Sequence, residues 1–139
     1  MSTPRELVES FYDDVWNRRD VGAGRQVIAP GFRFRGSLGP EKQGLDGFLN
    51  YLDAVHAALG GFTCIIEDLV ETPERAAARM RFRGVHQAEL FGVPATGKMI
   101  EWSGAAFFTV RQEQLAELWV LGDVDAVKRQ LGPAAASDF

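Results

Sequence analysis

Two kinds of side chain alternate along the stretch Ala76-Ala77-Ala78-Arg79-Met80-Arg81-Phe82-Arg83-Gly84-Val85-His86. From Ala78 onward every second position holds a small or apolar residue, and this row ends in His86, whereas arginines fill most of the positions between. Because successive side chains of a β-strand point to opposite faces, the pattern predicts a strand with one face toward a core. The arginine row then faces solvent or a second subunit, and His86 lies at the end of the core-facing row.

Three further strands are expected around this one, over residues 62–71, 98–110 and 115–121. The segment Thr72-Pro73-Glu74-Arg75 indicates a turn, because proline is favoured at the second position of a β-turn. Residues 111–114 indicate another turn. Turns this short join antiparallel neighbours, so the second half of the chain predicts an antiparallel sheet.

The first half of the chain has helical patterns. Thr3-Pro4-Arg5-Glu6 matches a capping box with proline at the first helical position, and apolar residues at helical spacing carry this helix to about Asn17. Further helices are expected over residues 20–28, 45–59 and 123–131, and a short strand over 32–35. Helices followed by long strands with short turns predict an α+β fold, in which helices cover one face of a curved antiparallel sheet. We expect one domain over residues 1–132 and a flexible tail over 133–139.

The composition excludes several classes of partner. The chain has 139 residues, 15 of them Lys or Arg and 19 Asp or Glu, with a net charge of −4. Nucleic acids and anionic membranes bind clustered Lys and Arg, and without such a cluster neither is an expected partner. The single cysteine, Cys64, excludes an internal disulfide. With no signal-peptide pattern and no apolar stretch of membrane length, a cytoplasmic location is expected.

Two strand segments are apolar on both faces. They are Ala105-Ala106-Phe107-Phe108 and Leu118-Trp119-Val120-Leu121. One face of the sheet can pack on the helices, but the other then exposes apolar side chains around Phe107 and Val120. A second copy of the chain is the simplest cover for such a surface, so a homodimer is expected.

Two motifs resemble ligand sites without meeting their requirements. Gly92-Val93-Pro94-Ala95-Thr96-Gly97-Lys98 has the spacing of a phosphate-binding loop, but Met99 follows where that motif needs Ser or Thr, and a strand follows where it needs a helix. The histidines His56 and His86 are far apart in sequence, and neither has a second ligand at close spacing. We therefore expect a plain loop between strands at residues 89–97 and no metal site.

His86 and Asp123 are the candidate catalytic residues. His86 is either a half-exposed histidine at the rim of the sheet or a pocket residue that donates to a ligand. Asp123 ends an alternating row that contains Glu117, Trp119 and Leu121, and an acid beside apolar residues is costly to bury in its ionised form. Asp123 also stands where the last helix begins, and aspartate is a favoured N-cap. The acid/base and capping roles of Asp123 are compatible, and both stay open.

Aromatic side chains come from nearly every expected element. Since a sheet beneath helices is hard to fill at its widest point, some of these side chains are expected to line a largely apolar pocket for a small hydrophobic molecule. The predicted wall residues are Trp16, Phe48, Trp102, Phe108 and Trp119.

Short motifs spread over nearly the whole chain follow one known pattern. They are Phe11-Tyr12 with Val15-Trp16-Asn17, Ala29-Pro30-Gly31-Phe32, Gly84-Val85-His86, Phe91 through Lys98, Ser103-Gly104, Glu117-Leu118-Trp119 with Asp123, and Gln130-Leu131-Gly132. The sharpest are the Gly-x-Pro-Ala-Thr-Gly loop and the Trp-x-x-x-Asp ending. Taken together, they resemble the SnoaL-like polyketide cyclases of the nuclear-transport-factor-2-like superfamily.

This resemblance implies a cystatin-like α+β barrel, in which a curved sheet and helices form a cone around a deep hydrophobic pocket, and commonly a homodimer. Characterised members of the family close a ring of an aromatic polyketide by intramolecular aldol condensation, without a metal or an organic cofactor. An aspartate that matches Asp123 is their acid/base, and a histidine that matches His86 lies nearby. Arg35 stands about where members often carry a histidine, so the polar lining of the pocket differs here.

Two hypotheses about function follow. In the first, the protein is a cofactor-independent cyclase or isomerase: Asp123 removes a proton next to a carbonyl, and His86 or Arg35 stabilises the enolate. In the second, the protein is not an enzyme. It then binds a small hydrophobic molecule, or serves as a dimeric accessory protein whose cone is filled by its own side chains.

Overall fold

The structure is a computed structural model that describes residues 2–135. Its helices are α1 (Pro4–Ser10), η1 (Phe11–Asn17), α2 (Val21–Val27), α3 (Gly44–Ala58) and α4 (Val124–Leu131). Its strands are β1 (Ile28–Arg35), β2 (Glu41–Gln43), β3 (Leu59–Glu71), β4 (Arg75–His86), β5 (Met99–Arg111) and β6 (Gln114–Gly122). The last four residues of the expected tail, 136–139, lie outside the described residues.

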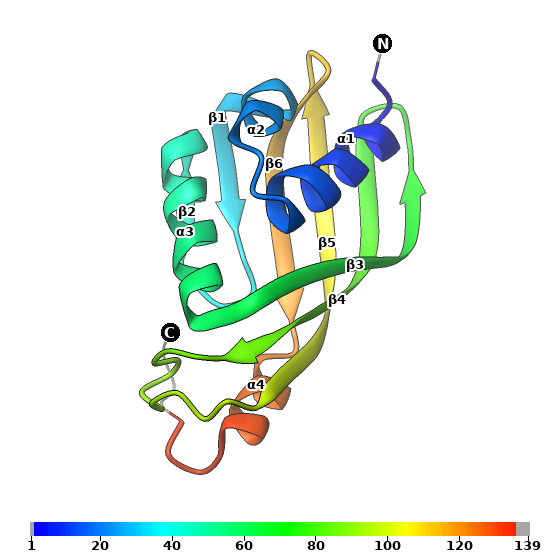
Figure 1. The fold of residues 1–139 in the computed structure, drawn as a ribbon. Helices are drawn as coiled ribbons and strands as arrows, with labels where there is room; N and C mark the ends of the chain where they lie inside the picture. The colour runs from blue at the N-terminus through cyan, green and yellow to red at the C-terminus, as the bar shows by residue number, and fades with distance from the viewer. Residues whose placement is uncertain (1, 136–139) are drawn as a thin grey trace.

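The six strands form one curved sheet in the order β2-β1-β6-β5-β4-β3 (Figure 1). Every pairing in the described sheet is antiparallel except that of β1 with β6, which is parallel and was not expected. The strand β1 also begins earlier than predicted, and its register with β6 shifts between Ile28 and Arg33. Pro30 lies inside this shift, where its missing N–H does not interrupt the hydrogen-bonded ladder. Because β2 and β3 form the two edges, the sheet is not closed into a complete barrel.

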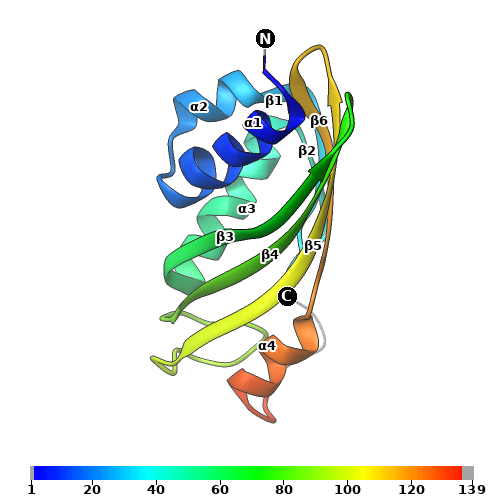
Figure 2. The same cartoon turned by 90° about the vertical axis from the view of Figure 1, so that its right-hand side faces the viewer.

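All helices of the first half of the chain lie on one face of the sheet. Figure 2 shows α1, α2 and α3 on that side of the sheet, whereas α4 lies at its lower end, beside β5. We refer to the face that carries α1, α2 and α3 as the covered face and to the opposite one as the open face. The capping box that starts α1 is present as predicted: Glu6 N donates to Thr3 Oγ1 at 3.2 Å, and Thr3 N donates to Glu6 Oε1 at 3.0 Å. Within the described residues, no helix is both long and apolar enough to cross a membrane.

The first helix continues as a π-helix, η1, after Ser10. Short π-helical segments are rare and often occur near functional sites. Phe11, Tyr12, Val15 and Trp16 are all buried in η1, against the covered face of the sheet. At its end, Asn17 Oδ1 accepts from Cys64 N at 2.8 Å and Asn17 Nδ2 donates to Cys64 O at 2.9 Å. These two bonds attach η1 to β3.

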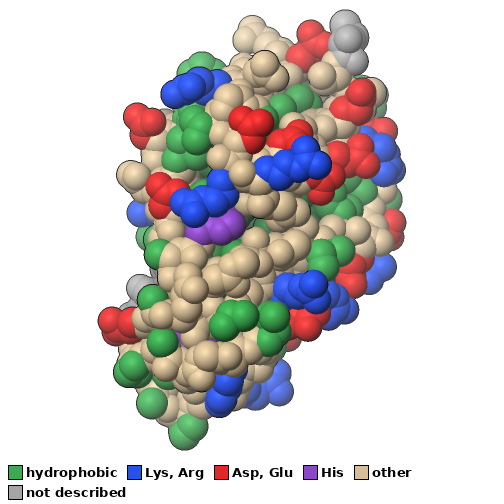
Figure 3. All heavy atoms as spheres, in the orientation of Figure 1, with side chains coloured by type: hydrophobic (Ala, Val, Ile, Leu, Met, Phe, Trp, Pro, Cys, Tyr) green, Lys and Arg blue, Asp and Glu red, His purple; other side chains and the backbone are tan. Residues whose placement is uncertain are grey.

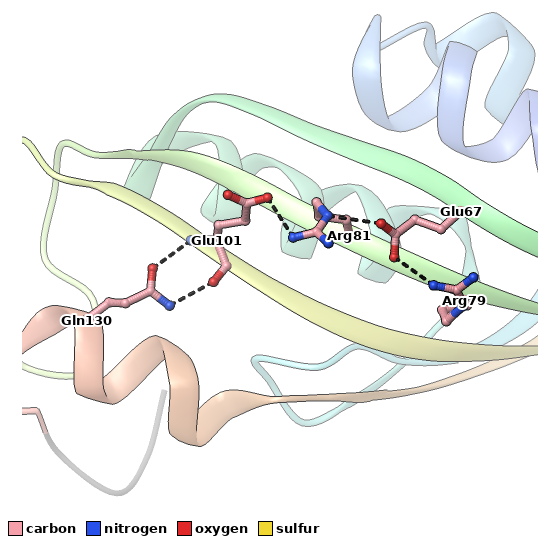
Figure 4. A network of polar contacts seen from close by, with 5 residues as sticks. All are labelled: Glu67, Arg79, Arg81, Glu101 and Gln130. Atoms are coloured by element: carbon pink, nitrogen blue, oxygen red, sulfur yellow. Dashed lines mark hydrogen bonds and ion pairs between the residues drawn. The ribbon is translucent and has the colours of Figure 1, made fainter.

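The alternation predicted for β4 is confirmed. Its small and apolar row from Ala76 to His86 is buried, whereas Arg79 and Arg83 are exposed and Arg81 is half-buried on the open face. The open face also carries an ion-pair network in which Glu67 contacts Arg79 and Arg81, and Arg81 contacts Glu101 (Figure 4). Two arginines of the row, Arg79 and Arg81, are therefore paired within the protein.

In β6 the predicted faces are wrong: Trp119 was expected in the pocket wall, and Val120 on the exposed face. Trp119 is 46% exposed and Leu121 56% exposed on the open face, while Leu118 and Val120 are buried. The reason is the pairing with β5, which places Leu118 beside the buried Phe108 and Trp119 beside the exposed Phe107. The expected apolar open face is present at Phe107, but Val120 belongs to the core.

Candidate functional site

A small cavity of about 20 Å³ lies between η1, α3 and the covered face of the sheet. The π-helix contributes Tyr12 and Trp16 to its lining, and α3 contributes Tyr51 and Val55. The strands contribute mainly aromatic and aliphatic side chains, among them Phe34, Phe62, Phe82, Trp102 and Val120. A space of this size holds about one water molecule. The deep pocket implied by the resemblance is therefore not open in this structure.

The segment Gly36–Leu38, which follows β1, covers the cavity. Leu38 is buried with 4% of its surface exposed, and it lines the cavity together with Gly36 and Ser37. Two hydrogen bonds hold the segment: Leu38 N donates to the Tyr51 hydroxyl at 3.1 Å, and Trp102 Nε1 donates to Ser37 Oγ at 3.3 Å. The Leu38 side chain thus forms part of the cavity wall.

The polar groups of the cavity stay protonated over a wide pH range. Burial raises the pKa of the Tyr12 hydroxyl well above its usual value, with smaller contributions from Cys64 and Tyr51. Burial likewise raises the pKa of the Tyr51 hydroxyl and that of the Cys64 thiol. Each of these groups is neutral at physiological pH. The cavity therefore offers neutral hydrogen-bonding groups in an apolar wall.

The predicted wall residues divide into three sets. Trp16 and Trp102 line the cavity. Phe48 and Phe108 are fully buried but pack in an aromatic cluster around Phe11, with ring centroids 5.2 Å and 5.7 Å from that of Phe11. Trp119 was expected in the wall and lies on the open face, with its ring centroid 6.0 Å from that of Phe107.

Arg35 also lies on the open face, away from the cavity. Its Nη1 donates to the carbonyl of Val120 at 2.6 Å, and its guanidinium lies 5.5 Å from the centre of the Trp119 ring. The reason is the alternation of β1: Phe32 and Phe34 take the covered face, so the arginines between and after them point outward. The prediction of Arg35 as a polar group of the pocket lining is wrong for this structure.

His86 is fully buried, so its interpretation as a half-exposed rim residue is wrong. Its Nδ1 lies 3.2 Å from Thr96 N, which donates to it, and 2.8 Å from Thr96 Oγ1. Because Nδ1 accepts from a backbone N–H, the proton of the neutral ring sits on Nε2. Nε2 is buried and has no hydrogen-bond partner among residues 2–135. His86 does not line the small cavity, and its catalytic role stays a prediction.

Asp123 caps the last helix, as one of its two interpretations predicted. Its Oδ1 accepts from Ala126 N at 3.0 Å, and its own N–H donates to Ser103 O at 2.9 Å. The side chain is exposed and does not line the cavity, contrary to the expectation of a carboxylate enclosed by apolar residues. Asp123 nevertheless follows Gly122, where an added Cβ would lie 2.3 Å from Ser37 Cβ and 3.1 Å from Trp102 Nε1. The backbone before Asp123 therefore borders the segment that covers the cavity.

Most residues that line the cavity were not predicted, among them Tyr12, Tyr51 and Leu38. Tyr12 and Tyr51 lie among apolar residues at helical spacing, and the polar ends of their side chains were the available signal. Leu38 stands alone between glycines in a loop, and nothing in the local pattern marks it as a buried residue. Its position follows from contacts with distant parts of the chain.

The surface around the site carries charges of both signs. Figure 3 shows acidic and basic side chains interspersed over the helix-bearing face. Among residues 2–135, no group of three or more His, Cys, Asp or Glu side chains is placed to hold a metal ion.

Comparison with known proteins identifies similar sequences and folds. The family model for the SnoaL-like polyketide cyclases matches residues 6–131. IdmH from Streptomyces antibioticus, a proposed polyketide cyclase, is 26% identical, with a TM-score of 0.82 over 94% of this chain and 99% of that one. A proposed polyketide cyclase from Acidithiobacillus ferrooxidans is 24% identical, with a TM-score of 0.82 over 97% and 100% of the two chains.

AclR from Streptomyces galilaeus, a proposed hydroxylase, has the same fold with a TM-score of 0.78. It is 18% identical over 92% of this chain and 94% of its own. A comparison with curated protein sequences found no significant match. The similar structures thus agree in fold but include more than one proposed activity.

Proposed function

Because the chain belongs to the SnoaL-like polyketide cyclase family, we propose that it binds a small polyketide-like or other hydrophobic ring compound inside the cone. The observation that carries this proposal is the apolar cavity beneath Leu38. Aromatic rings dominate its wall, and aromatic side chains bind flat hydrophobic rings through large contact areas. The neutral hydroxyls of Tyr12 and Tyr51 favour an uncharged ligand, because an unpaired charge is costly to bury.

Movement of Leu38 provides the room that such a ligand needs. The segment Gly36–Leu38 is held by two side-chain hydrogen bonds, each contributing about 1 kcal/mol to stability. When Leu38 moves out, its side chain loses apolar contacts with the cavity wall. A ligand that fills the same space makes new apolar contacts with that wall. We therefore infer that the closed cavity is the unliganded state and that the ligand displaces Leu38.

Titration with tetralin, a two-ring hydrocarbon, tests this proposal. Trp16 and Trp102 line the cavity, and Trp119 lies on the open face, so in a Trp119→Phe background tryptophan fluorescence reports on the cavity. Leu38→Ala removes the side chain that fills the space, and apolar cavities made by such truncations bind hydrocarbon rings. In the parent, the Leu38 side chain competes with the ligand for this space. We expect Leu38→Ala to bind tetralin about tenfold or more tightly than the parent, which corresponds to about 1.4 kcal/mol of binding free energy.

Leu121→Ala is the matched control, since Leu121 is exposed on the opposite face of the sheet. It removes the same side chain and should leave tetralin binding unchanged. If tetralin does not quench the tryptophan fluorescence of either the parent or Leu38→Ala, the cone does not bind ring compounds. The alternative of a dimeric accessory protein then gains support.

Cyclisation by proton abstraction is a second candidate function. Family membership supports it, and so does the position of Asp123, one residue beyond Gly122 and the covering segment. When Leu38 moves, Asp123 would lie at the entrance to the enlarged cavity. There it could remove a proton next to a ligand carbonyl while the apolar wall limits the access of water.

Deuterium exchange at the α-carbon of 1-tetralone in heavy water, followed by NMR, tests this second function. Asp123→Asn keeps much of the capping ability of the side chain but removes the base. If the protein is a catalyst, the exchange rate above the buffer background should fall about a hundredfold or more. An unchanged rate in Asp123→Asn would exclude Asp123 as the base.

A further inference from the structure

The hydroxyl of Tyr12 is a buried polar group without a hydrogen-bond partner among the described residues. Tyr12 is 2% exposed, and its side chain lines the cavity beneath Leu38. Buried hydroxyls nearly always have a partner, because an unpaired one loses its hydrogen bonds to water without replacement. A partner for Tyr12 is therefore expected to enter from the cavity.

The neighbouring polar groups each accept a hydrogen bond within the protein. The Tyr51 hydroxyl accepts from Leu38 N, and Ser37 Oγ accepts from Trp102 Nε1. A single water in the cavity of about 20 Å³ is one candidate partner for Tyr12. An oxygen on a ligand, which brings its own apolar frame, would displace that water and take over its hydrogen bond.

The Tyr12 hydroxyl acts as a donor in this environment. Burial raises its pKa well above the usual value, so the phenol keeps its proton across the physiological range. A phenol O–H donates more readily than it accepts, and the cavity lining contains no acid or base to neutralise a charged ligand group. A neutral acceptor oxygen is the matching ligand group.

We propose that Tyr12 is the specificity-determining residue of the cavity and that the ligand is a ring ketone whose carbonyl oxygen accepts from the Tyr12 hydroxyl. This inference rests on the proposed binding function and adds the chemical class of the ligand. The carbonyl points inward to η1, and the rest of the ring system occupies the space vacated by Leu38.

The test compares 1-tetralone with tetralin, which lacks the carbonyl oxygen. Dissociation constants are measured by tryptophan quenching in the Trp119→Phe background. The parent should bind 1-tetralone about tenfold more tightly than tetralin, the usual scale for satisfying a buried donor. Tyr12→Phe should bind both compounds equally. Tyr51→Phe should tighten both alike, because the segment that the ligand displaces loses one of the hydrogen bonds that hold it, and should keep the tenfold preference.

The outcomes separate this inference from the function on which it rests. Equal binding of the two compounds by the parent, or a preference that survives in Tyr12→Phe, would show that Tyr12 does not select the ligand, while the binding function stands. If neither compound binds to the parent or to Leu38→Ala, the binding function and the inference both fail. Thermal unfolding of Tyr12→Phe checks that it is folded, since the substitution breaks no hydrogen bond within residues 2–135.

Discussion

The two tyrosines of the cavity use their hydroxyls differently. Tyr51 accepts from Leu38 N at 3.1 Å, and Tyr12 has no partner in the described part of the chain. The two residues are otherwise alike: both are aromatic, buried and carried on a helix that covers the sheet. Removing the Tyr51 hydroxyl therefore measures the contribution of a hydrogen bond to stability. Removing the Tyr12 hydroxyl measures the cost of a buried polar group without a partner.

We expect Tyr51→Phe to lower the free energy of unfolding by about 1 kcal/mol or more, because Leu38 N is left without its acceptor. Tyr12→Phe should leave stability unchanged or raise it by about 1 kcal/mol, because it removes a buried group that has no partner. Denaturant unfolding of the two variants measures both values. A loss of stability in Tyr12→Phe equal to that in Tyr51→Phe would show that the Tyr12 hydroxyl has a partner in the unliganded protein.

At the scale of elements, α4 protects the part of β5 that extends beyond β6. The pairing of β5 with β6 ends at Gly104 and Gly122, so the backbone of residues 99–103 has no strand on that side. Gln130 of α4 takes the place of a strand residue: Glu101 N donates to its Oε1 at 2.9 Å, and its Nε2 donates to Glu101 O at 2.7 Å (Figure 4). An unpaired edge of this kind invites pairing with another chain.

Replacing Gln130 should loosen α4 from the sheet. Gln130→Ala removes both bonds and should cost about 1–3 kcal/mol, because a partly buried N–H and C=O lose their partners. Hydrogen exchange at the Glu101 amide reports the change directly, and protection in Gln130→Ala equal to that of the wild type would contradict this role.

At the scale of the whole molecule, the open face of the sheet carries an apolar patch that we define as Phe107, Trp119 and Leu121. These side chains are 45%, 46% and 56% exposed. Near the patch, Arg33 is paired with Glu117 and Arg35 lies over the Trp119 ring, so the surface is suited to a second copy of the chain. We propose that the protein is a homodimer through this patch.

Leu121→Lys should convert the dimer to a monomer, because a buried, unpaired ammonium group costs several kcal/mol. Val21→Lys is the matched control, since Val21 is 39% exposed on α2, on the other side of the sheet. Light scattering at micromolar concentration should give a dimer for the wild type and Val21→Lys. A wild type that is monomeric under these conditions would remove the proposal.

The cavity also predicts how stability depends on pH. Burial raises the pKa of Cys64, Tyr12 and Tyr51 above the ordinary values of 9.0 for cysteine and 10.0 for tyrosine. In the unfolded chain these groups lose their protons at the ordinary values, whereas the folded chain retains them. Their contribution to stability is therefore full below about pH 9 and is lost as the pH rises further.

We expect the free energy of unfolding to fall above about pH 9, by up to about 1.4 kcal/mol per pH unit for each group that ionises only in the unfolded state. Denaturant unfolding between pH 7 and pH 11 measures this slope. The slope above pH 10 should be smaller in Tyr12→Phe, which has one such group fewer. A slope that is the same in the variant would show that Tyr12 ionises equally in both states.

Much of the fold was predictable from local patterns. The capping box at Thr3, the alternation of β4 and the turn at residues 72–75 each depend on neighbours within a few positions, and each is found where expected. Which face of β6 is buried was not predictable in this way, because both faces are apolar. Leu118 and Val120 lie on one face, and Trp119 and Leu121 lie on the other. A register shift between Thr109 and Val110, which leaves Ala116 unpaired opposite them, sets which row is buried.

The sequence by itself determined most of the helices and strands, though not β2 or the early start of β1, and it determined which residues of β4 face the core. Hydrophobic periodicity and capping act over short distances. The tertiary structure alone decided that Asp123 and Arg35 lie outside the cavity, that Leu38 lines it, and that Tyr12 lines it with no hydrogen-bond partner among residues 2–135. Those positions depend on contacts between residues far apart in the chain, such as Leu38 with Tyr51 and Ser37 with Trp102. Strand register and loop closure bring these residues together, and neither leaves a periodic signal in the sequence.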